Sequence, residues 1–383
     1  MSALFPERYK TDIPPFLRKN DVLSKAVFRY PPPFGFQSME RKLKEVLGLF
    51  PEAAQEERSM KSCSRCVVVG SGGIMRGLQR VQTFVTEVLQ RKCKRSSTRK
   101  NMSALFPERY KTDIPPFLRK NDVLSKAVFR YPPPFGFQSM ERKLKEVLGL
   151  FPEAAQEERS MKSCSRCVVV GSGGIMRGLQ VGQLLNQFDV VIRLNNAPVS
   201  NFIEDIGNKT TIRMSYPEGS PKSWDDVDPK TLFVAVIYKT VDFNWLKAMI
   251  KRETVGVPKE IPIGISQFRI LNPEIISQTA VDLLQFSEPR WRFWGWDQNV
   301  PTLGVTATVL ATYLCDEVSL AGFGYDLTQP EAPLHYYENR RMDAMKGETM
   351  HNVDAEKQLL AKLVKAGVIT DLTGGIHCSF CEN

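Results

Sequence analysis

Residues 1–79 of this 383-residue chain are repeated without a single change at residues 102–180. The units of repeat folds are shorter and more numerous than this pair, so the repeat indicates a recent exon duplication or a gene-model error. Only the second copy continues into a helix pattern and a further strand, and a lone strand can neither pair its backbone nor bury its face. We therefore predict one folded domain over 102–383, a basic linker at 80–101 and no independent domain in 1–79. The alternative is that the first copy competes for the same place in the sheet.

The net charge of +10 is concentrated in the segment 80–101, which holds seven Lys or Arg and one Glu. Such a segment is typical of a solvated linker or of an arm that binds nucleic acid. No stacking aromatic residues are interleaved with these charges, as single-strand binders require, so we expect a linker and no nucleic-acid partner. No apolar run reaches the roughly 18–20 residues of a membrane-spanning helix. The first residues also lack a signal-peptide core, and we expect a soluble chain or the soluble part of a longer one.

Short apolar strands alternate with helical patterns over the second half of the chain. The expected strands are CVVVG from Cys167, DVVIRL from Asp189, TTIRM from Thr210, TLFVAVIYK from Thr231, FRIL from Phe268 and VSLAGFG from Val318. The expected helices cover residues 175–188, 273–286, 302–316 and 354–367, from their apolar spacing and their start and stop residues. This alternation predicts an α/β domain whose mostly parallel sheet is covered on both faces. Ligands of such sheets bind at the carboxyl ends of the strands.

The eight cysteines include two copies of the sequence CSRC, beginning at Cys63 and Cys164. A C-x-x-C pair is typical of a zinc site, a redox pair or two disulfide partners. Because one pair duplicates the other, the two are not independent evidence for a four-cysteine zinc site. Cys167 stands at the start of an apolar strand, where a structural disulfide in an oxidising compartment is the favoured alternative. The sequence leaves the partner of Cys164 open.

A glycine-rich turn follows the first strand of the predicted domain. Gly171, Gly173 and Gly174 let the backbone pass close to a ligand, and the helix expected from Ile175 would point its amides at a phosphate. A dinucleotide fingerprint would have glycine where Met176 stands and an acidic residue after the next strand, which ends in RLNNAP instead. A nicotinamide-dependent oxidoreductase is therefore disfavoured. A nucleotide with one phosphate and a purely structural turn remain as alternatives.

Three histidines are candidates for chemistry. His351 directly precedes a predicted helix, whose dipole disfavours the imidazolium, and a neutral imidazole suits a general base. His335 lies in PLHYYEN, which is typical of a pocket lip, whereas His377 lies near the chain end in HCSFC, a weak candidate for a small metal site. The alternative for each is a surface or capping histidine.

Two further short patterns each allow a functional and a bland interpretation. The sequence DDVDP contains a D-x-D pair, Asp226 and Asp228, of the kind that nucleotide-sugar enzymes use to hold a metal on a diphosphate. Its proline and its polar surroundings favour an ordinary polar loop. Asn208 begins the sequon NKT, which is a glycosylation site only if the chain is luminal.

Four segments together resemble the motifs of animal sialyltransferases. Residues 164–219 resemble the large sialylmotif, and residues 300–326, beginning VPTLGVTATVLATYLCDEVSL, resemble the small one. HYYE from His335 resembles the third motif, and His351 with Glu356 resembles the H-x4-E motif. The four occur in the family's order across roughly residues 164–370.

The resemblance implies a member of glycosyltransferase family 29 with a single Rossmann-like α/β/α domain, a variant of the GT-A class. It implies inverting transfer of sialic acid from CMP-sialic acid to the 3-hydroxyl of a terminal galactose, with no metal or other cofactor. His351 would be the general base, and His335 would donate to the departing phosphate. The implied donor site consists of Ser172, Gly173, Asn195, Thr302, Gly304, Gly322, Gly324 and Tyr336. Cys167 and Cys315 would form the disulfide that joins the two sialylmotifs.

Segments such as GSGGI, VDFNWL and FWGWDQNVPT are most similar to the family members that convert lactosylceramide to GM3 ganglioside, although the stretch 251–268 is shorter here. One alternative is sialylation of Gal-β1,3/4-GlcNAc on glycoproteins. Another is an inactive product of a duplicated exon or of a gene-model error. The resemblance implies a type II membrane protein of the Golgi lumen, glycosylated at Asn208 and meeting a membrane surface through its acceptor, although the family's anchor is absent from this chain. It does not indicate an oligomeric state.

Overall fold

The computed structural model describes residues 72–152, 164–221, 224–253, 261–288, 300–325, 328–347 and 350–381. The chain divides into two compact units, Met1–Gly70 and Ser71–Asn383. The first unit lies outside the described residues, so the prediction that residues 1–79 form no independent domain stays a prediction. Every element below belongs to the second unit.

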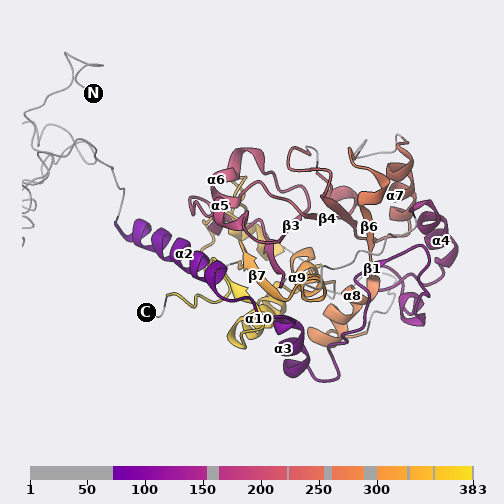
Figure 1. Cartoon of the computed structure of the whole chain (residues 1–383), viewed down its shortest axis with the longest axis horizontal. Helices are drawn as coiled ribbons and strands as arrows, with labels where there is room; N and C mark the ends of the chain where they lie inside the picture. Colours follow the sequence, from indigo (N-terminus) through magenta and orange to yellow (C-terminus); the bar gives the residue numbers. More distant parts are fainter. Residues whose placement is uncertain are drawn as a thin grey trace, which may run out of the picture. The chain divides into compact units, whose positions relative to one another are not determined.

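A single twisted sheet of eight strands organises the second unit (Figure 1). The strands are β1 (Phe117–Leu118), β2 (Arg166–Val170), β3 (Val190–Leu194), β4 (Ile212–Ser215), β5 (Leu232–Ala235), β6 (Phe268–Leu271), β7 (Glu317–Ala321) and β8 (Thr370–Asp371). Their order is β1-β6-β5-β4-β3-β2-β7-β8, and every pair is parallel except β1 with β6. The predicted mostly parallel sheet is therefore confirmed. The two-residue edge strands β1 and β8 were not predicted, because they are too short to show a hydrophobic period.

Helices cover both faces of the sheet. One face carries α3 (Ser97–Leu105), α8 (Pro273–Ser277), α9 (Leu303–Leu314) and α10 (Val353–Lys365); the other carries α2 (Gly72–Gln90), α4 (Glu141–Leu150), α5 (Gly182–Leu185), α6 (Ile203–Ile206) and α7 (Asp242–Lys251). Short 3-10 turns lie at Lys126–Phe129, Gly174–Met176, Ser200–Phe202, Pro217–Gly219, Ile265–Gln267 and Met342–Gly347, and α8 continues as a π-helical segment, Gln278–Leu283. Side chains of β2 alternate between the two cores: Val169 packs with α9, whereas Val168 packs with α2 and α5. Burial on both faces explains why β2 is apolar from Cys167 to Val170.

The helix expected over 175–188 is wrong. Only the 3-10 turn Gly174–Met176 and the short α5 form there, and Gly178 (φ +74°) and Gln180 (φ +51°) between them are left-handed. The Asp205 carboxylate accepts from the backbone N–H groups of Gly178 (2.8 Å) and Gln180 (3.0 Å). Apolar spacing favoured a helix, but these bonds from a residue of α6 stabilise a turn instead.

The expected linker at 80–101 is also wrong, because most of this segment is helical and packs on the domain. Helix α2 presents Val81, Val85 and Val88 at helical spacing, and none of the three is more than 7% exposed. Cys93 then forms a disulfide with Cys164, directly before β2. Basic residues surround this apolar stripe, and the charge of the segment favoured a linker over a packed helix. The predicted domain start at residue 102 therefore lies too far along the chain.

Two further disulfides lie in the described part of the chain. Cys167 of β2 is joined to Cys315 at the end of α9, which is the pairing that the family resemblance implies. Cys378 is joined to Cys381 in the C-terminal segment. All of the described cysteines are therefore in disulfides, and no group of three or more His, Cys, Asp or Glu side chains that could hold a metal is found among the described residues.

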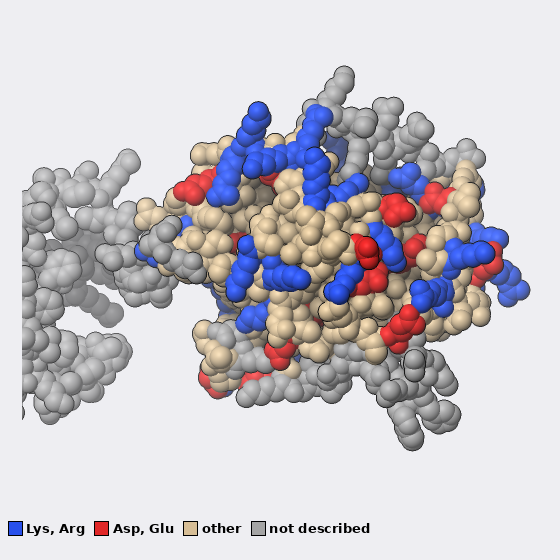
Figure 2. All heavy atoms as spheres, turned by 90° about the horizontal axis from the view of Figure 1, so that it is seen from below, with Lys and Arg blue, Asp and Glu red and all other residues tan. Residues whose placement is uncertain are grey.

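The basic side chains of the segment 80–101 lie on the surface. Lys92, Lys94, Arg95 and Lys100 are exposed. Figure 2 shows one face of the molecule, with blue Lys and Arg side chains spread over it and red carboxylates between them. On this face the two signs of charge are interspersed, unlike the single-sign surface of a typical nucleic-acid site. In the ranges described, no helix is long and apolar enough to cross a bilayer.

The Cys167–Cys315 disulfide predicts a measurable stability difference. It closes a sequence separation of 148 residues, whereas Cys378–Cys381 closes only 3. Because the entropy removed from the unfolded chain grows with the loop, we expect Cys167→Ala/Cys315→Ala to lower the free energy of unfolding by about 3–5 kcal/mol and Cys378→Ala/Cys381→Ala by at most about 2 kcal/mol. Urea unfolding under oxidising conditions measures both. Equal stability of the first variant and the parent would contradict the bridge.

Candidate active site

A cavity of about 900 Å³ opens at the carboxyl edge of the sheet, where β2, β3 and β7 end. From β2 the chain continues to β3 on one side of the sheet, whereas β7 pairs with β2 on the other side. The connections after β2 and β7 therefore run in opposite directions, and a crevice forms between them. The residues expected at the site that line this cavity are Ser172, Gly173, Asn195, Thr302, Gly304, Gly322, Gly324, His335 and His351. The fold therefore brings together side chains from four distant segments.

The glycines after β2 and β7 are required by a close contact between two loops. A Cβ on Gly171 would lie 2.5 Å from the carbonyl oxygen of Gly322, and a Cβ on Gly173 would lie 2.6 Å from the same atom. The backbone N–H of Gly173 donates to this oxygen (3.0 Å), and Gly322 itself has φ +73°. These glycines therefore join two loops beneath the cavity. The expected arrangement, with a long helix beginning at Ile175, is absent from this described segment.

The loop that carries His335 lies against the glycine turn. Gly174 N–H donates to the Leu334 carbonyl (3.1 Å), and Tyr336 N–H donates to the Ser172 carbonyl (3.0 Å). Nδ1 of His335 is hydrogen-bonded to the Glu338 carboxylate. An ionised carboxylate can only accept, so Nδ1 carries a proton and Nε2 is the ring atom that a ligand can meet.

His351 lies across the cavity with its tautomer set by a backbone carbonyl. Its Nδ1 lies 2.7 Å from the carbonyl oxygen of Val300, which can only accept, so the proton is on Nδ1. The lone pair of a neutral ring is then on Nε2. His351 directly precedes Asn352, whose side chain caps α10 by accepting from the N–H of Ala355 (3.0 Å). The ring therefore lies at the N-terminal end of α10, where the sequence predicted it.

Glu356 joins the two helices that border the cavity. It is 4% exposed, and its carboxylate oxygens accept from the backbone N–H (2.7 Å) and the hydroxyl (2.5 Å) of Thr302, the N-cap of α9. Burial raises the pKa of Glu356, whereas the bonds from Thr302 and the charge of His351 act to lower it. The carboxylate thus connects the N-terminal ends of α9 and α10 next to His351.

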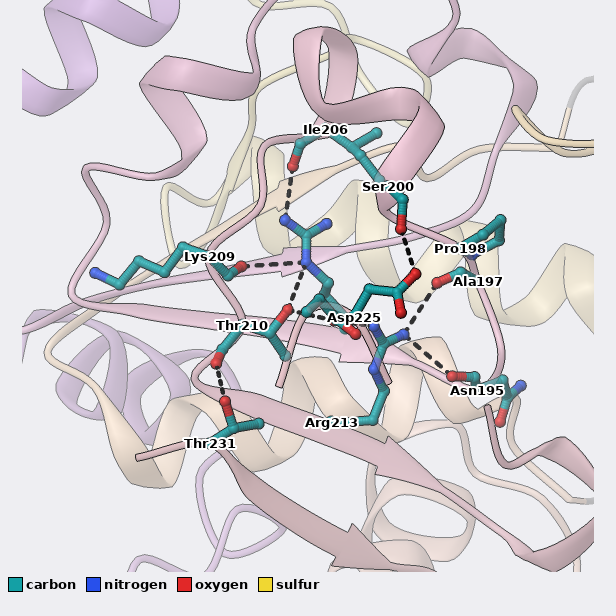
Figure 3. Close-up of polar contacts among 12 residues, drawn as sticks. Asn195, Ala197, Pro198, Ser200, Ile206, Lys209, Thr210, Arg213, Asp225 and Thr231 are labelled. Atoms are coloured by element: carbon teal, nitrogen blue, oxygen red, sulfur yellow. Dashed lines mark hydrogen bonds and ion pairs between the residues drawn. The ribbon is translucent and has the colours of Figure 1, made fainter. Parts of the chain in front are cut away.

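Asn195, at the end of β3, is held in a left-handed conformation (φ +48°) by a buried arginine. Arg213 donates to the carbonyls of Asn195 and Ala197, both at 3.1 Å (Figure 3). It also pairs with Asp226. Nearby, burial and repulsion from Arg213 lower the pKa of Arg193 to about 10. The Arg193 guanidinium donates to backbone carbonyls of the loop before β4 and to the Thr210 hydroxyl.

The carboxylates of the D-x-D pattern have structural partners, as the polar-loop alternative requires. Asp226 accepts from Thr210 (2.6 Å) in addition to Arg213. Asp228 accepts from the backbone N–H groups of Lys230 (2.7 Å) and Thr231 (3.0 Å). Nothing in the sequence identified Asp226 as the partner of a buried arginine, because the two come together only through the β4–β5 connection.

Tyr336 does not line the cavity, contrary to expectation. It is 3% exposed, and its hydroxyl donates to the Pro198 carbonyl (2.7 Å) from beneath the cavity, so burial raises its pKa. The neighbouring Tyr337 lines the cavity instead and stacks on the His335 ring, 5.2 Å between centroids. Period-two alternation predicts that adjacent tyrosines face opposite ways, but it does not indicate which of the two faces inward.

The cavity residues that the sequence did not indicate include four that follow β4 and β5. Tyr216 and Tyr238 face each other edge to face, 5.3 Å between ring centroids, and Lys239 pairs with Glu218 beside them. All four follow the ends of β4 and β5, so the rule that ligands bind at strand ends was the available signal.

Asn208, the residue of the glycosylation sequon, is exposed and lies outside the cavity.

Comparison with known proteins gives consistent results. The chain is 54% identical over 314 residues to lactosylceramide alpha-2,3-sialyltransferase of Pan troglodytes, covering 79% of this chain and 87% of the relative. The human protein of the same name is 53% identical over 314 residues, with 79% and 75% covered. Human CMP-N-acetylneuraminate-beta-1,4-galactoside alpha-2,3-sialyltransferase is 39% identical over 299 residues, with 74% and 77% covered.

The fold is shared with a solved relative, and a family profile matches most of the chain. The crystal structure of a mammalian sialyltransferase in complex with Gal-beta-1-3GalNAc-ortho-nitrophenol aligns with a TM-score of 0.57 at 25% identity, covering 73% of this chain and 98% of that one. Residues 16–80 and 117–368 match the profile of glycosyltransferase family 29 (sialyltransferase). With its motifs gathered around one cavity of the expected fold, the chain belongs to glycosyltransferase family 29, the sialyltransferases.

Proposed function

We propose that this sialyltransferase transfers sialic acid from CMP-sialic acid to the 3-hydroxyl of the terminal galactose of lactosylceramide, giving GM3 ganglioside. The observation that carries the chemistry is His351, whose Nδ1–H bond to Val300 directs a basic Nε2 toward the cavity. The identity of 53–54% to lactosylceramide alpha-2,3-sialyltransferases supports this acceptor over the glycoprotein acceptor, whose transferase is 39% identical.

In the proposed reaction, Nε2 of His351 accepts the proton of the galactose 3-hydroxyl while its oxygen attacks the anomeric carbon of sialic acid. The bond from that carbon to the phosphate oxygen breaks on the opposite face, so the configuration inverts and CMP leaves. The imidazolium formed at His351 is stabilised by the nearby Glu356 carboxylate. His335 acts as the imidazolium: its Nδ1–H is held by Glu338, and its Nε2–H donates to the departing phosphate, whose negative charge grows as the bond breaks.

We propose that the donor lies over the loops joined beneath the cavity. Ser172, Gly173 and Asn195 would hold one side of CMP, and Thr302, Gly304, Gly322 and Gly324 the other. CMP carries one phosphate, so there is no diphosphate for a metal to bridge. The half-buried rings of Tyr216 and Tyr238 line the same cavity, where a sugar can pack against them.

We also propose a type II membrane protein of the Golgi lumen that meets the membrane surface through its lipid acceptor. The described disulfides support a compartment that is oxidising. The exposure of Asn208 supports its glycosylation, since the sequon side chain is accessible.

Removal of the general base is the most direct test. His351→Ala should lower kcat by about 10²–10⁴-fold, the usual range for a general base, while CMP still binds. Transfer kinetics with CMP-sialic acid and lactosylceramide, together with calorimetric CMP binding, measure both. His377→Ala, a change outside the cavity, is the control and should retain parental kcat. Unchanged turnover in His351→Ala would contradict the mechanism.

Glu356→Gln tests the connection between α9 and α10. The amide oxygen can still accept from the Thr302 N–H, and the NH2 group can donate to the Thr302 hydroxyl. Two charge-assisted bonds then become weaker neutral ones, at a cost of about 1–3 kcal/mol, and the negative charge beside His351 is removed. We expect thermal unfolding at a lower temperature and a reduced kcat. Thr302→Ser keeps the hydroxyl and is expected to behave like the parent. If Glu356→Gln matched the parent in both measurements, the carboxylate would have no such role.

The extent of the catalytic unit is tested by shortening the chain. We propose that residues 1–71 are dispensable, so a chain starting at Gly72 should transfer sialic acid at the parental rate. A chain starting at Met102 loses the buried Val85 and the disulfide partner of Cys164, and it should be unstable and inactive. Equal activity of all three chains would show that α2 is not needed.

The same assay separates the alternatives. Transfer only to Gal-β1,3/4-GlcNAc of a glycoprotein would favour the second acceptor class. Activity of the Gly72 chain but not of the full chain would indicate that the first copy disturbs the fold. No transfer by any chain to any acceptor would favour an inactive product of a duplicated exon.

A further inference from the structure

Arg177 lies directly after the 3-10 turn Gly174–Met176 and makes an unusual set of contacts. Its Nε donates to the Tyr336 carbonyl (2.8 Å), and its Nη2 donates to the carbonyls of His335 (3.2 Å) and Glu338. All three acceptors belong to the backbone of the loop that carries His335. Arg177 itself is not among the residues that line the cavity.

The guanidinium group suits this arrangement. Its donors form a rigid planar fork that stays protonated at every relevant pH, so a single side chain can hold several carbonyls in a fixed geometry. No carboxylate in the described ranges pairs with Arg177, and its contact with Glu338 is to the backbone oxygen. The Glu338 carboxylate is therefore left to hold Nδ1 of His335.

Backbone bonds hold the loop on both sides of residues 337–339, since the Leu334 N–H donates to the Arg340 carbonyl (2.8 Å) and the Tyr336 N–H to the Ser172 carbonyl. The backbone bonds of Leu334 and Tyr336 anchor the loop where it crosses the glycine turn. Beyond Tyr336, the carbonyl of Glu338 is held by Arg177. This contact matters for the imidazole, because Glu338 reaches His335 only if the backbone turns back within three residues.

We propose that Arg177 is a positioning residue for His335. It holds the 335–338 backbone so that Glu338 orients the imidazole and Nε2 faces the departing phosphate. The inference rests on the role that the proposed function gives His335. Arg177 acts through His335 and touches neither substrate.

The duplicated sequence shows that this role depends on the fold. Arg76 is the counterpart of Arg177 in the first copy, with identical neighbours on both sides. The backbone there is part of the continuous helix α2, whereas Arg177 follows a single turn. The contact of Arg177 therefore depends on the turn toward the His335 loop, and the local sequence does not by itself specify it.

A double-mutant cycle with His335 tests the proposal in the full chain. Arg177→Ala should lower kcat about 10–100-fold with little change in the KM for CMP-sialic acid, because misplacing a catalytic group by about 1 Å has effects of this size. In a His335→Ala background, Arg177→Ala should change kcat less than about twofold, since there is no imidazole left to position. Arg177→Lys, with one compact donor, should recover part of the loss.

The control is Arg142→Ala, which removes an exposed arginine of α4 whose ion-pair partner, Glu146, lies 3.9 Å away; it should retain parental kcat. Thermal unfolding of every variant identifies those that fail to fold, and if Arg177→Ala is among them, Arg177→Lys takes its place in the cycle. An equal loss from Arg177→Ala in both backgrounds, or no loss in either, would overturn the positioning role. Parental kcat in His335→Ala would instead overturn the role of His335 in the proposed function.

Discussion

The structure depends on the close approach of two loops at the carboxyl edge of the sheet. The turn after β2 and the loop after β7 come so near that a Cβ on Gly171 would lie 2.5 Å from the Gly322 carbonyl oxygen. The Cys167–Cys315 disulfide ties the opposite end of β2 to α9. With both ends of β2 held, the cavity has a rigid floor, and the segments bearing His335 and His351 are built on it.

Both histidines are prepared for their proposed roles by what lies behind them. A carbonyl behind His351 leaves its outward nitrogen without a proton, as a base needs. A carboxylate behind His335 holds Nδ1 and leaves Nε2 as the outward atom. The two rings are therefore distinguished by their acceptors, and the sequence around each histidine does not reveal which acceptor it meets. Pre-set orientation of this kind lowers the reorganisation required during reaction.

Much of the fold follows from local patterns. Six of the eight strands and the helices α8, α9 and α10 lie where apolar runs, caps and proline placed them. Helix α2 was missed because its buried stripe of Val81, Val85 and Val88 is set among basic residues. Of the site, the motifs indicated the loops and both histidines. The sequence could not show that Tyr336 faces away from the cavity while Tyr337 faces into it, since adjacent tyrosines differ only through the loop's pairing with Ser172.

The identical segments Gly72–Gln79 and Gly173–Gln180 separate what the sequence determines from what the tertiary structure decides. The first lies within a continuous helix; the second is a single 3-10 turn followed by left-handed residues. The local sequence makes both segments glycine-rich, so that each can adopt more than one backbone conformation. It also determined the alternation of strands and helices that builds a parallel sheet. Long-range bonds decided the rest, because Asp205 takes the N–H groups of Gly178 and Gln180 that a helix would have used. Gly322 and Leu334 hold the preceding turn through the N–H groups of Gly173 and Gly174. A segment of weak helical preference adopts whichever structure its partners complete.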